Sequence, residues 1–273
     1  MKKFKKFFVR VPILVIILFN LIFLLINFFH LIQEEIIIKH ISKNIVSSGE
    51  LEDIEILREV LLFVNNNVSF NKGKRGYFRA SSIEILTDNI GGQCGEFARL
   101  SIALLNEFGI PAHRVYLFTK KDGKRFSNHV LIEVSIDGTW ILADPLYNFI
   151  FYDSYTKDFF NIRINEEESY IKFINKFHGV ALKRCDAPDT FIYTYPIDFK
   201  NINDYSLIYW ERIPLKKISR KIFKLIFHKK NHQIPLPFIL EKPYLFKFVI
   251  FIILFLFFTL IYFEILGKQK KKF

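Results

Sequence analysis

The sequence has few cysteines and none of the motifs that mark a phosphate or metal site. Its 273 residues include only Cys94 and Cys185, so the chain can form at most one disulfide of its own. It contains no glycine-rich phosphate loop, no cluster with metal-ligand spacing and no internal repeat. We therefore expect no cofactor and no bound metal.

Acidic residues are in the minority. The chain carries 39 Lys and Arg against 27 Asp and Glu, which gives a formal net charge of +12. The basic surplus lies beside two apolar stretches and does not form a groove interleaved with aromatic residues. This pattern argues against nucleic acid as a partner and indicates a membrane.

Two apolar stretches are long enough to cross the hydrocarbon core of a bilayer, which is about 30 Å thick. The first covers residues 11–33 and the second residues 244–266. The first stretch lacks a small-x-small cleavage site, so we interpret it as an uncleaved signal anchor.

Charges beside the two spans predict the topology. Basic residues crowd segments 1–10 and 267–273, whereas Glu34 and Glu35 follow the first span. The positive-inside rule then places both termini in the cytoplasm. We accordingly expect residues 34–211 to form an extracytoplasmic domain, with its core at about 48–150.

One basic segment allows a second interpretation. Residues 212–232 combine eight Lys and Arg with a single apolar stripe, which is typical of an amphipathic helix on anionic lipid headgroups. Taken as a charge count, the same segment argues for a cytoplasmic loop. Anionic headgroups are therefore a predicted partner, and the topology depends on which span dominates.

Cys94 lies where a glycine-containing turn, Gly91-Gly92, leads into a predicted helix. Apolar residues recur at helical spacing after Cys94, and Gly109 and Pro111 end the pattern. Cys94 is then at or near the first helical position. The unpaired N–H groups and the dipole at a helix start favour an anion there, which favours thiolate.

A predicted β-hairpin follows, with His129 on one strand and Asp144 on the other. Asp137-Gly138 is a type I′ turn signal that pairs Ile136 with Thr139. On that register Asp144 faces Leu131 and is the diagonal neighbour of His129, within reach of its side chain. The opposite face is apolar and consists of Val130, Ile132, Val134, Ile136, Ile141 and Ala143.

These residues carry a resemblance to a known family. GGQCGEFARLSIALLNEFGIPAHRVYL and NHVLIEVSIDGTWILADPLYN resemble the core of the transglutaminase-like superfamily. The resemblance covers roughly residues 75–150. It implies an α+β, papain-like fold in which a nucleophile helix packs on an antiparallel sheet, here flanked by two transmembrane helices. The family's usual His-Ala-Trp is His129-Val130-Leu131 here, and His113 stands near the place of a common Arg.

The resemblance implies a catalytic triad of Cys94, His129 and Asp144 and acyl transfer through a thioester. We expect the backbone N–H of Cys94 to be one oxyanion donor and suggest Gln93 as a second. Water as acceptor would make the protein a peptidase or amidase acting on peptide or cell-envelope substrates, and an amine acceptor would make it a cross-linking transglutaminase. A membrane-tethered scaffold without activity is the third possibility.

Each of these residues also has a structural interpretation. Cys94 could pair with Cys185, His129 could be a strand-end residue, and Asp144-Pro145 alone is a turn signal. Glu96 and Arg99 are expected to be structural or solvated, and Trp140 to pack around the triad.

The remaining domain is predicted more coarsely. Ser47-x-x-Glu50 has the pattern of a capping box for a helix that carries Ile54, Leu57, Leu61 and Val64 and ends at residues 65–67. Residues 151–210 are expected to add strands or a helix to the core.

Overall fold

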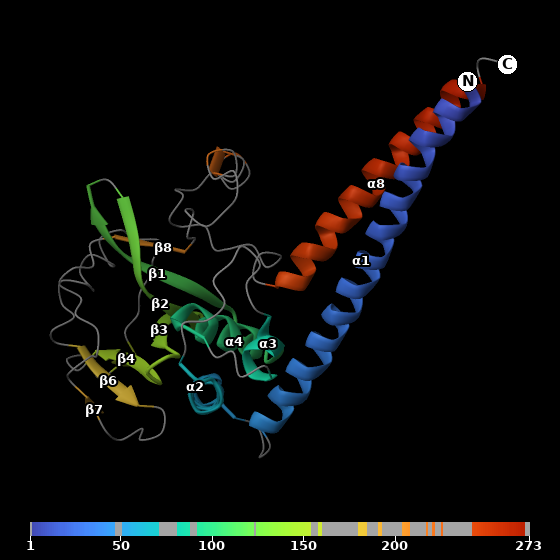
Figure 1. Cartoon of the computed structure of the whole chain (residues 1–273). Coiled ribbons are helices and arrows are strands. Elements are labelled where there is room, and N and C mark those ends of the chain that lie inside the picture. Colours follow the sequence, from blue (N-terminus) through green and yellow to red (C-terminus); the bar gives the residue numbers. More distant parts are fainter. Residues whose placement is uncertain are drawn as a thin grey trace. The chain divides into compact units, whose positions relative to one another are not determined.

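The computed structural model describes two compact units, one formed by Met1–Ile36 with Phe238–Phe273 and the other by Ile37–Pro237 (Figure 1). The described residues are 2–46, 51–70, 81–87, 92–122, 124–153, 158–159, 180–184, 191–192, 204–207 and 242–270, with isolated positions 217, 220, 221 and 225. Most of the predicted basic segment 212–232 lies outside them.

The first unit is a pair of antiparallel helices, α1 (Lys2–Ile45) and α8 (Pro243–Lys270). Both are long and apolar enough to cross a membrane, over Val11–Ile45 and Pro243–Ile265. Aromatic contacts join them: Phe23 stacks on Phe251 with ring centroids 5.3 Å apart. At one end Lys242 Nζ lies 2.7 Å from Glu35 Oε2.

Two asparagines within α1 keep their polar groups satisfied inside the helix. The amide nitrogens of Asn20 and Asn27 donate to the carbonyl oxygens four residues earlier, at 2.8 and 2.7 Å. Asn20, Asn27 and Glu34 follow each other at intervals of seven residues and are all buried. That spacing puts the three polar side chains on one side of the helix.

α1 is continuous beyond the predicted end of the first span. Its last turns, from residue 37 onward, belong to the second unit, where Ile38 is 4% exposed and joins the core.

Helix α2 (Asp53–Asn67) begins later than the sequence pattern predicts. Its N-cap is Glu52, whose backbone N–H donates to Glu55 Oε2 at 3.3 Å. The prediction of a helix start at Ser47-x-x-Glu50 was therefore wrong; residues 47–50 themselves lie outside the described part of the chain. Asp53 and Glu55 in the first turn match the positive end of the helix dipole and fix the start there. The predicted end at residues 65–67 is confirmed.

Helix α4 (Cys94–Glu107) follows the short α3 (Ser82–Thr87). It ends as the sequence predicts, because Gly109 has φ +75° and lets the chain leave the helix in a left-handed conformation. The N–H of Ile110 then closes on the carbonyl of Leu105 at 3.1 Å.

The sheet is antiparallel and has the strand order β7-β6-β4-β3-β2-β1-β8, with β5 paired to β4. Its long strands are β1 (Ala112–Lys121), β2 (Lys124–Ile136), β3 (Thr139–Asp144) and β4 (Phe149–Asp153). The shorter strands are β5 (Asp158–Phe159), β6 (Val180–Arg184), β7 (Phe191–Ile192) and β8 (Asp204–Ser206). The described parts of residues 151–210 thus add strands to the sheet, which is one of the two alternatives expected for this region.

The β2–β3 hairpin has the predicted register. Ile136 pairs with Thr139, and both turn residues, Asp137 and Gly138, have positive φ as a type I′ turn requires. The ladder of paired residues ends at Ile132 with Ala143, and on the other edge of β3 Asp144 pairs with Phe149 of β4. The position of Asp144 opposite Leu131 would continue this register by one residue and stays a prediction.

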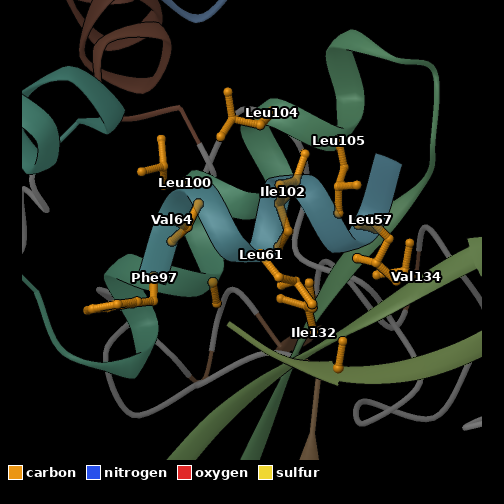
Figure 2. Packing of buried hydrophobic residues seen from close by; sticks show 14 of the residues in the cluster. Leu57, Leu61, Val64, Phe97, Leu100, Ile102, Leu104, Leu105, Ile132 and Val134 are labelled. Carbon is orange, nitrogen blue, oxygen red and sulfur yellow. The ribbon is translucent and has the colours of Figure 1, made fainter. Parts of the chain in front are cut away.

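The core lies between the helices and one face of the sheet (Figure 2). α4 packs against β1 and β2, and α2 packs against α4. The six apolar hairpin residues that the register assigns to one face all lie in this core: Val130, Ile132, Val134, Ile136, Ile141 and Ala143. The fold is therefore α+β, with a helix that begins at Cys94 packed on an antiparallel sheet.

Candidate active site

The turn before Cys94 requires a glycine. A Cβ on Gly92 would lie 2.4 Å from Glu96 Cβ, because the Glu96 side chain folds back over the helix start. There Glu96 Oε2 accepts the N–H of Gln93 at 3.0 Å. The Gly92 N–H in turn donates to the carbonyl of Ser69 at 3.0 Å. Glu96 is thus a structural residue, as expected, and its capping contact fixes where the helix begins.

Cys94 is the first residue of α4, with Gln93 at the N-cap. Its thiol is free and partly buried, so Cys94 does not form the disulfide that the structural interpretation allows. Cys185 lies outside the described residues. The first-turn N–H groups of a helix have no partner within the helix, and they attract negative charge to this position.

His129 lies almost completely buried, 2% exposed, near the register shift where β1 and β2 slip between Leu117 and Phe118. Its Nε2 lies 2.7 Å from Asp144 Oδ2, and its imidazole also hydrogen-bonds the Cys94 thiol. Because Asp144 occupies Nε2, the nitrogen left for the thiol is Nδ1. The structure therefore brings together the three residues that the sequence nominates.

Asp144 is fully buried and uses its two oxygens for different tasks. Oδ2 contacts His129, whereas Oδ1 accepts the backbone N–H of Leu146 at 3.0 Å and of Tyr147 at 3.4 Å. The second set of contacts holds the turn that follows Asp144-Pro145. One oxygen of Asp144 therefore makes the turn contacts and the other contacts His129, and the catalytic role of Asp144 stays a prediction.

The charges around His129 favour its protonated form. Burial alone lowers the pKa of an imidazole, but the carboxylate of Asp144, its hydrogen bond and the contact with Cys94 outweigh that effect. Together they raise the pKa of His129 from 6.5 to about 10. His129 therefore holds its proton more tightly than an isolated imidazole does, as the general acid of an acyl-transfer site must.

Tyr147 is a neighbour of the triad that the sequence pattern did not single out. Its ring centroid lies 5.8 Å from that of His129, with an angle of 37° between the planes. Burial, followed by the charges on Asp144 and Cys94, raises the pKa of the Tyr147 phenol. The signal that could have found it is its place three residues after Asp144, inside the turn that Asp144 caps.

Other candidate residues have structural contacts. Trp140 stacks on His113 with centroids 4.8 Å apart, so its described ring contact is with His113 and not with the triad. Arg99 is 2% exposed on the buried part of α4, which agrees with the structural alternative and not with the solvated one. Gln93 occupies the N-cap, and its role as an oxyanion donor stays a prediction.

Glu133 is a second buried ionisable residue outside the triad. It is 5% exposed on β2, two positions from Leu131, and pairs with Leu142 and His113 in the adjacent strands. Burial raises its pKa from 4.5 to about 8, so it is largely protonated at neutral pH. Within the part of the chain that the structure describes, no three His, Cys, Asp or Glu residues gather as a metal site would require.

Two solved structures are similar to parts of the chain, a candidate cysteine protease from Cytophaga hutchinsonii and a candidate protease from Parabacteroides distasonis. The first is 24% identical with a TM-score of 0.33, over 40% of this chain and 36% of that one. The second is 15% identical with a TM-score of 0.34, over 59% of this chain and 28% of that one. The chain thus spans about a third of the length of these proteins, and similarity at this level gives no information on substrate.

No curated protein matches this chain. Residues 39–145 match the model of the transglutaminase-like superfamily, a segment that runs from the end of α1 to Pro145 and includes Cys94, His129 and Asp144. The resemblance seen in the sequence is confirmed, and the α+β core of this protein has the transglutaminase-like fold.

Proposed function

We propose that this protein is a membrane-anchored cysteine acyl-transfer enzyme that acts on amide bonds, with Cys94, His129 and Asp144 as its catalytic residues. The observation that carries the proposal is the contact chain from Cys94 through the buried imidazole to Asp144 Oδ2. A structural histidine would not need both an anionic partner on one nitrogen and a thiol at a helix start on the other.

The proposed reaction proceeds in two steps. The Cys94 thiolate attacks the amide carbonyl carbon, and the oxyanion that forms accepts a hydrogen bond from the Cys94 backbone N–H. His129 then gives its proton to the nitrogen as the C–N bond breaks, which releases an amine and leaves a thioester on Cys94. Asp144 holds the imidazole orientation throughout.

The second step decides the reaction class. Neutral His129 removes a proton from water, the hydroxide oxygen attacks the thioester, and a carboxylic acid leaves while the thiolate is restored. This makes the protein a peptidase or amidase, with peptide or cell-envelope substrates as the proposed class. A primary amine in place of water would give a new amide by the same route and make the protein a transglutaminase.

A direct test uses the thioester. The full chain in detergent is incubated with peptide amides in H₂¹⁸O, with and without an added primary amine, and intact and product masses are recorded. An acyl adduct on Cys94 followed by an ¹⁸O-labelled acid supports hydrolysis, and an amine conjugate supports transamidation. Cys94→Ala, which has no thiol at this site, is the negative control. A folded wild-type protein that, like this control, forms no adduct with any substrate or thiol probe would contradict the proposal and favour a scaffold.

We also propose that α1 and α8 cross the membrane with both termini in the cytoplasm and the catalytic domain outside. The antiparallel helices bring the N-terminal end of α1 and the C-terminal end of α8 together, which supports termini on one side (Figure 1). The lysines before residue 11 and after residue 266 support the cytoplasmic side. A reporter after Phe273 should read as cytoplasmic and one at residue 72 as extracytoplasmic; cytoplasmic signals from both would contradict this topology.

A further inference from the structure

Tyr147 shares its partners with the catalytic histidine. Its backbone N–H lies 3.4 Å from Asp144 Oδ1, while Oδ2 of the same carboxylate contacts His129. Asn148, the next residue, has φ +58°, so the chain reverses directly after Tyr147 and enters β4. The turn therefore has little freedom to move the Tyr147 side chain away from the imidazole.

The Tyr147 ring lies against the charged histidine. The centroid distance of 5.8 Å is within the range of about 6 Å at which an aromatic face attracts a cation. His129 is 2% exposed, so water screens little of this attraction. The Tyr147 phenol is only partly buried, which places the residue between the buried triad and the solvent.

The Tyr147 hydroxyl is neutral under conditions in which the neighbouring His129 is protonated. Burial, Asp144 and Cys94 all raise the pKa of Tyr147, so the hydroxyl stays neutral wherever the triad is charged. A neutral ring adds no negative charge beside Asp144 or the sulfur, and it lies 5.8 Å from the imidazole at a tilt of 37°. The ring, and not the hydroxyl, is then the part of Tyr147 that matters.

We propose that Tyr147 is a positioning residue whose aromatic ring packs against His129, holds the imidazole in line between Asp144 and Cys94 and stabilises its protonated form. This inference rests on the proposed function, because it assigns Tyr147 to the same acyl-transfer site. It adds a residue that touches neither substrate nor the reacting bond but sets the pH range in which the thiolate–imidazolium pair exists.

The same protein contains a matched control. Trp140 stacks on His113 with centroids 4.8 Å apart, on a strand of the same sheet, and has no described ring contact with the triad. Trp140→Leu therefore removes an aromatic–histidine contact of the same kind without touching His129. It reports the effect of losing such a contact on the fold alone.

The test measures the rate of Cys94 alkylation by iodoacetamide against pH, for the full chain in detergent, followed by the mass of the Cys94 peptide. The variants are Tyr147→Phe, Tyr147→Leu, Trp140→Leu and His129→Ala. We expect Tyr147→Phe and Trp140→Leu to keep the wild-type profile. Tyr147→Leu should alkylate roughly three- to tenfold more slowly at pH 7, with its profile shifted upward.

The outcomes separate the two proposals. A wild-type rate at pH 7 no higher than that of His129→Ala would overturn the proposed function, and the inference with it. A fast wild type together with an unchanged Tyr147→Leu profile would overturn the inference alone. Equal losses in Tyr147→Phe and Tyr147→Leu would overturn it too, because the hydroxyl would then be responsible.

Discussion

His113 and His129 lie on neighbouring strands of one sheet, and each has an aromatic ring beside it, yet their charges differ. Burial lowers the pKa of His113, which has Trp140 against it, so the imidazole is neutral at pH 7. Burial acts on His129 in the same direction, but Asp144 and Cys94 reverse the result and bring its pKa to about 10. The difference teaches that neighbouring anions, and not burial or an aromatic contact, distinguish the candidate catalytic histidine.

The largest effect should follow from removing the thiol or the imidazole of the contact chain. Cys94→Ser and His129→Ala should both fold and lose essentially all turnover, because a serine hydroxyl is far less ionised than a thiol and the proposed reaction needs His129 for every proton transfer. The matching change in the comparison, His113→Gln, should leave turnover within about twofold. Initial rates on a substrate found by the thioester test check this. Equal losses in His113→Gln would remove the distinction between the two histidines.

Asp144→Asn should come next, because it tests the anion itself. An amide oxygen can still accept the N–H groups of Leu146 and Tyr147, so the turn should survive. The amide cannot balance the imidazolium, and a comparable change costs about 10⁴-fold in serine proteases. Turnover should fall by roughly 10³- to 10⁴-fold while the melting temperature changes little. Asp144→Ala should lower both turnover and the melting temperature. Full activity in Asp144→Asn would mean that Asp144 only stabilises the turn.

Asp144→Asn should also change how the free energy of unfolding depends on pH. The pKa of His129 is raised from 6.5 to about 10, so the folded state holds this proton more tightly than the unfolded state. Its stabilisation is complete below about pH 6.5 and is lost as the pH rises toward 10. Denaturant unfolding of the wild type should show this decline, and Asp144→Asn should flatten it. A parallel decline in both proteins would contradict the assignment.

Glu133 provides a test with a smaller expected effect and the opposite cause. Burial alone, and no neighbouring charge, shifts the pKa of this side chain. Burial raises its pKa from 4.5 to about 8, so ionisation opposes folding as the pH rises through that range. Glu133→Gln should remove this loss, which is on the order of a few kcal/mol between pH 5 and 8. Catalytic rates should not change. If the unfolding free energy of Glu133→Gln falls with rising pH as steeply as that of the wild type, ionisation of Glu133 is not the cause of the decline.

The smallest effect concerns His113 itself. Because burial lowers its pKa, protonation opposes folding and stability is lost as the pH falls below its ordinary value of 6.5. His113→Gln should make the domain less sensitive to acid without affecting the alkaline side. Unfolding curves at pH 5 and 7 would show it, and an unchanged acid sensitivity would mean that other groups are responsible.

Local signals in the sequence were sufficient for the parts of the site that depend on short-range geometry. The glycine turn and the apolar spacing locate the start of α4 at Cys94, and Asp137-Gly138 fixes the hairpin register. These features follow from backbone conformation and side-chain periodicity, which neighbouring residues determine.

The features that the sequence missed depend on contacts made after folding. Tyr147 reaches His129 through the turn after Asp144, and the Asp144 side chain accepts two N–H groups of that turn. Helix α2 starts at Asp53 and not at the predicted position before Glu50, because Glu55 supplies the capping contact there. Burial of Arg99 and Glu133 cannot be deduced from the spacing of polar residues alone.

The central claim is that His129, held by Asp144, makes Cys94 a more reactive nucleophile than an isolated thiol. Its most direct test compares the alkylation rate of Cys94 at pH 7 in the folded chain, in the urea-unfolded chain and in folded His129→Ala. We predict that the folded wild type reacts fastest, and that loss of His129 brings the rate to or below that of the unfolded chain. A folded wild-type thiol that reacts no faster than the unfolded one would contradict the account.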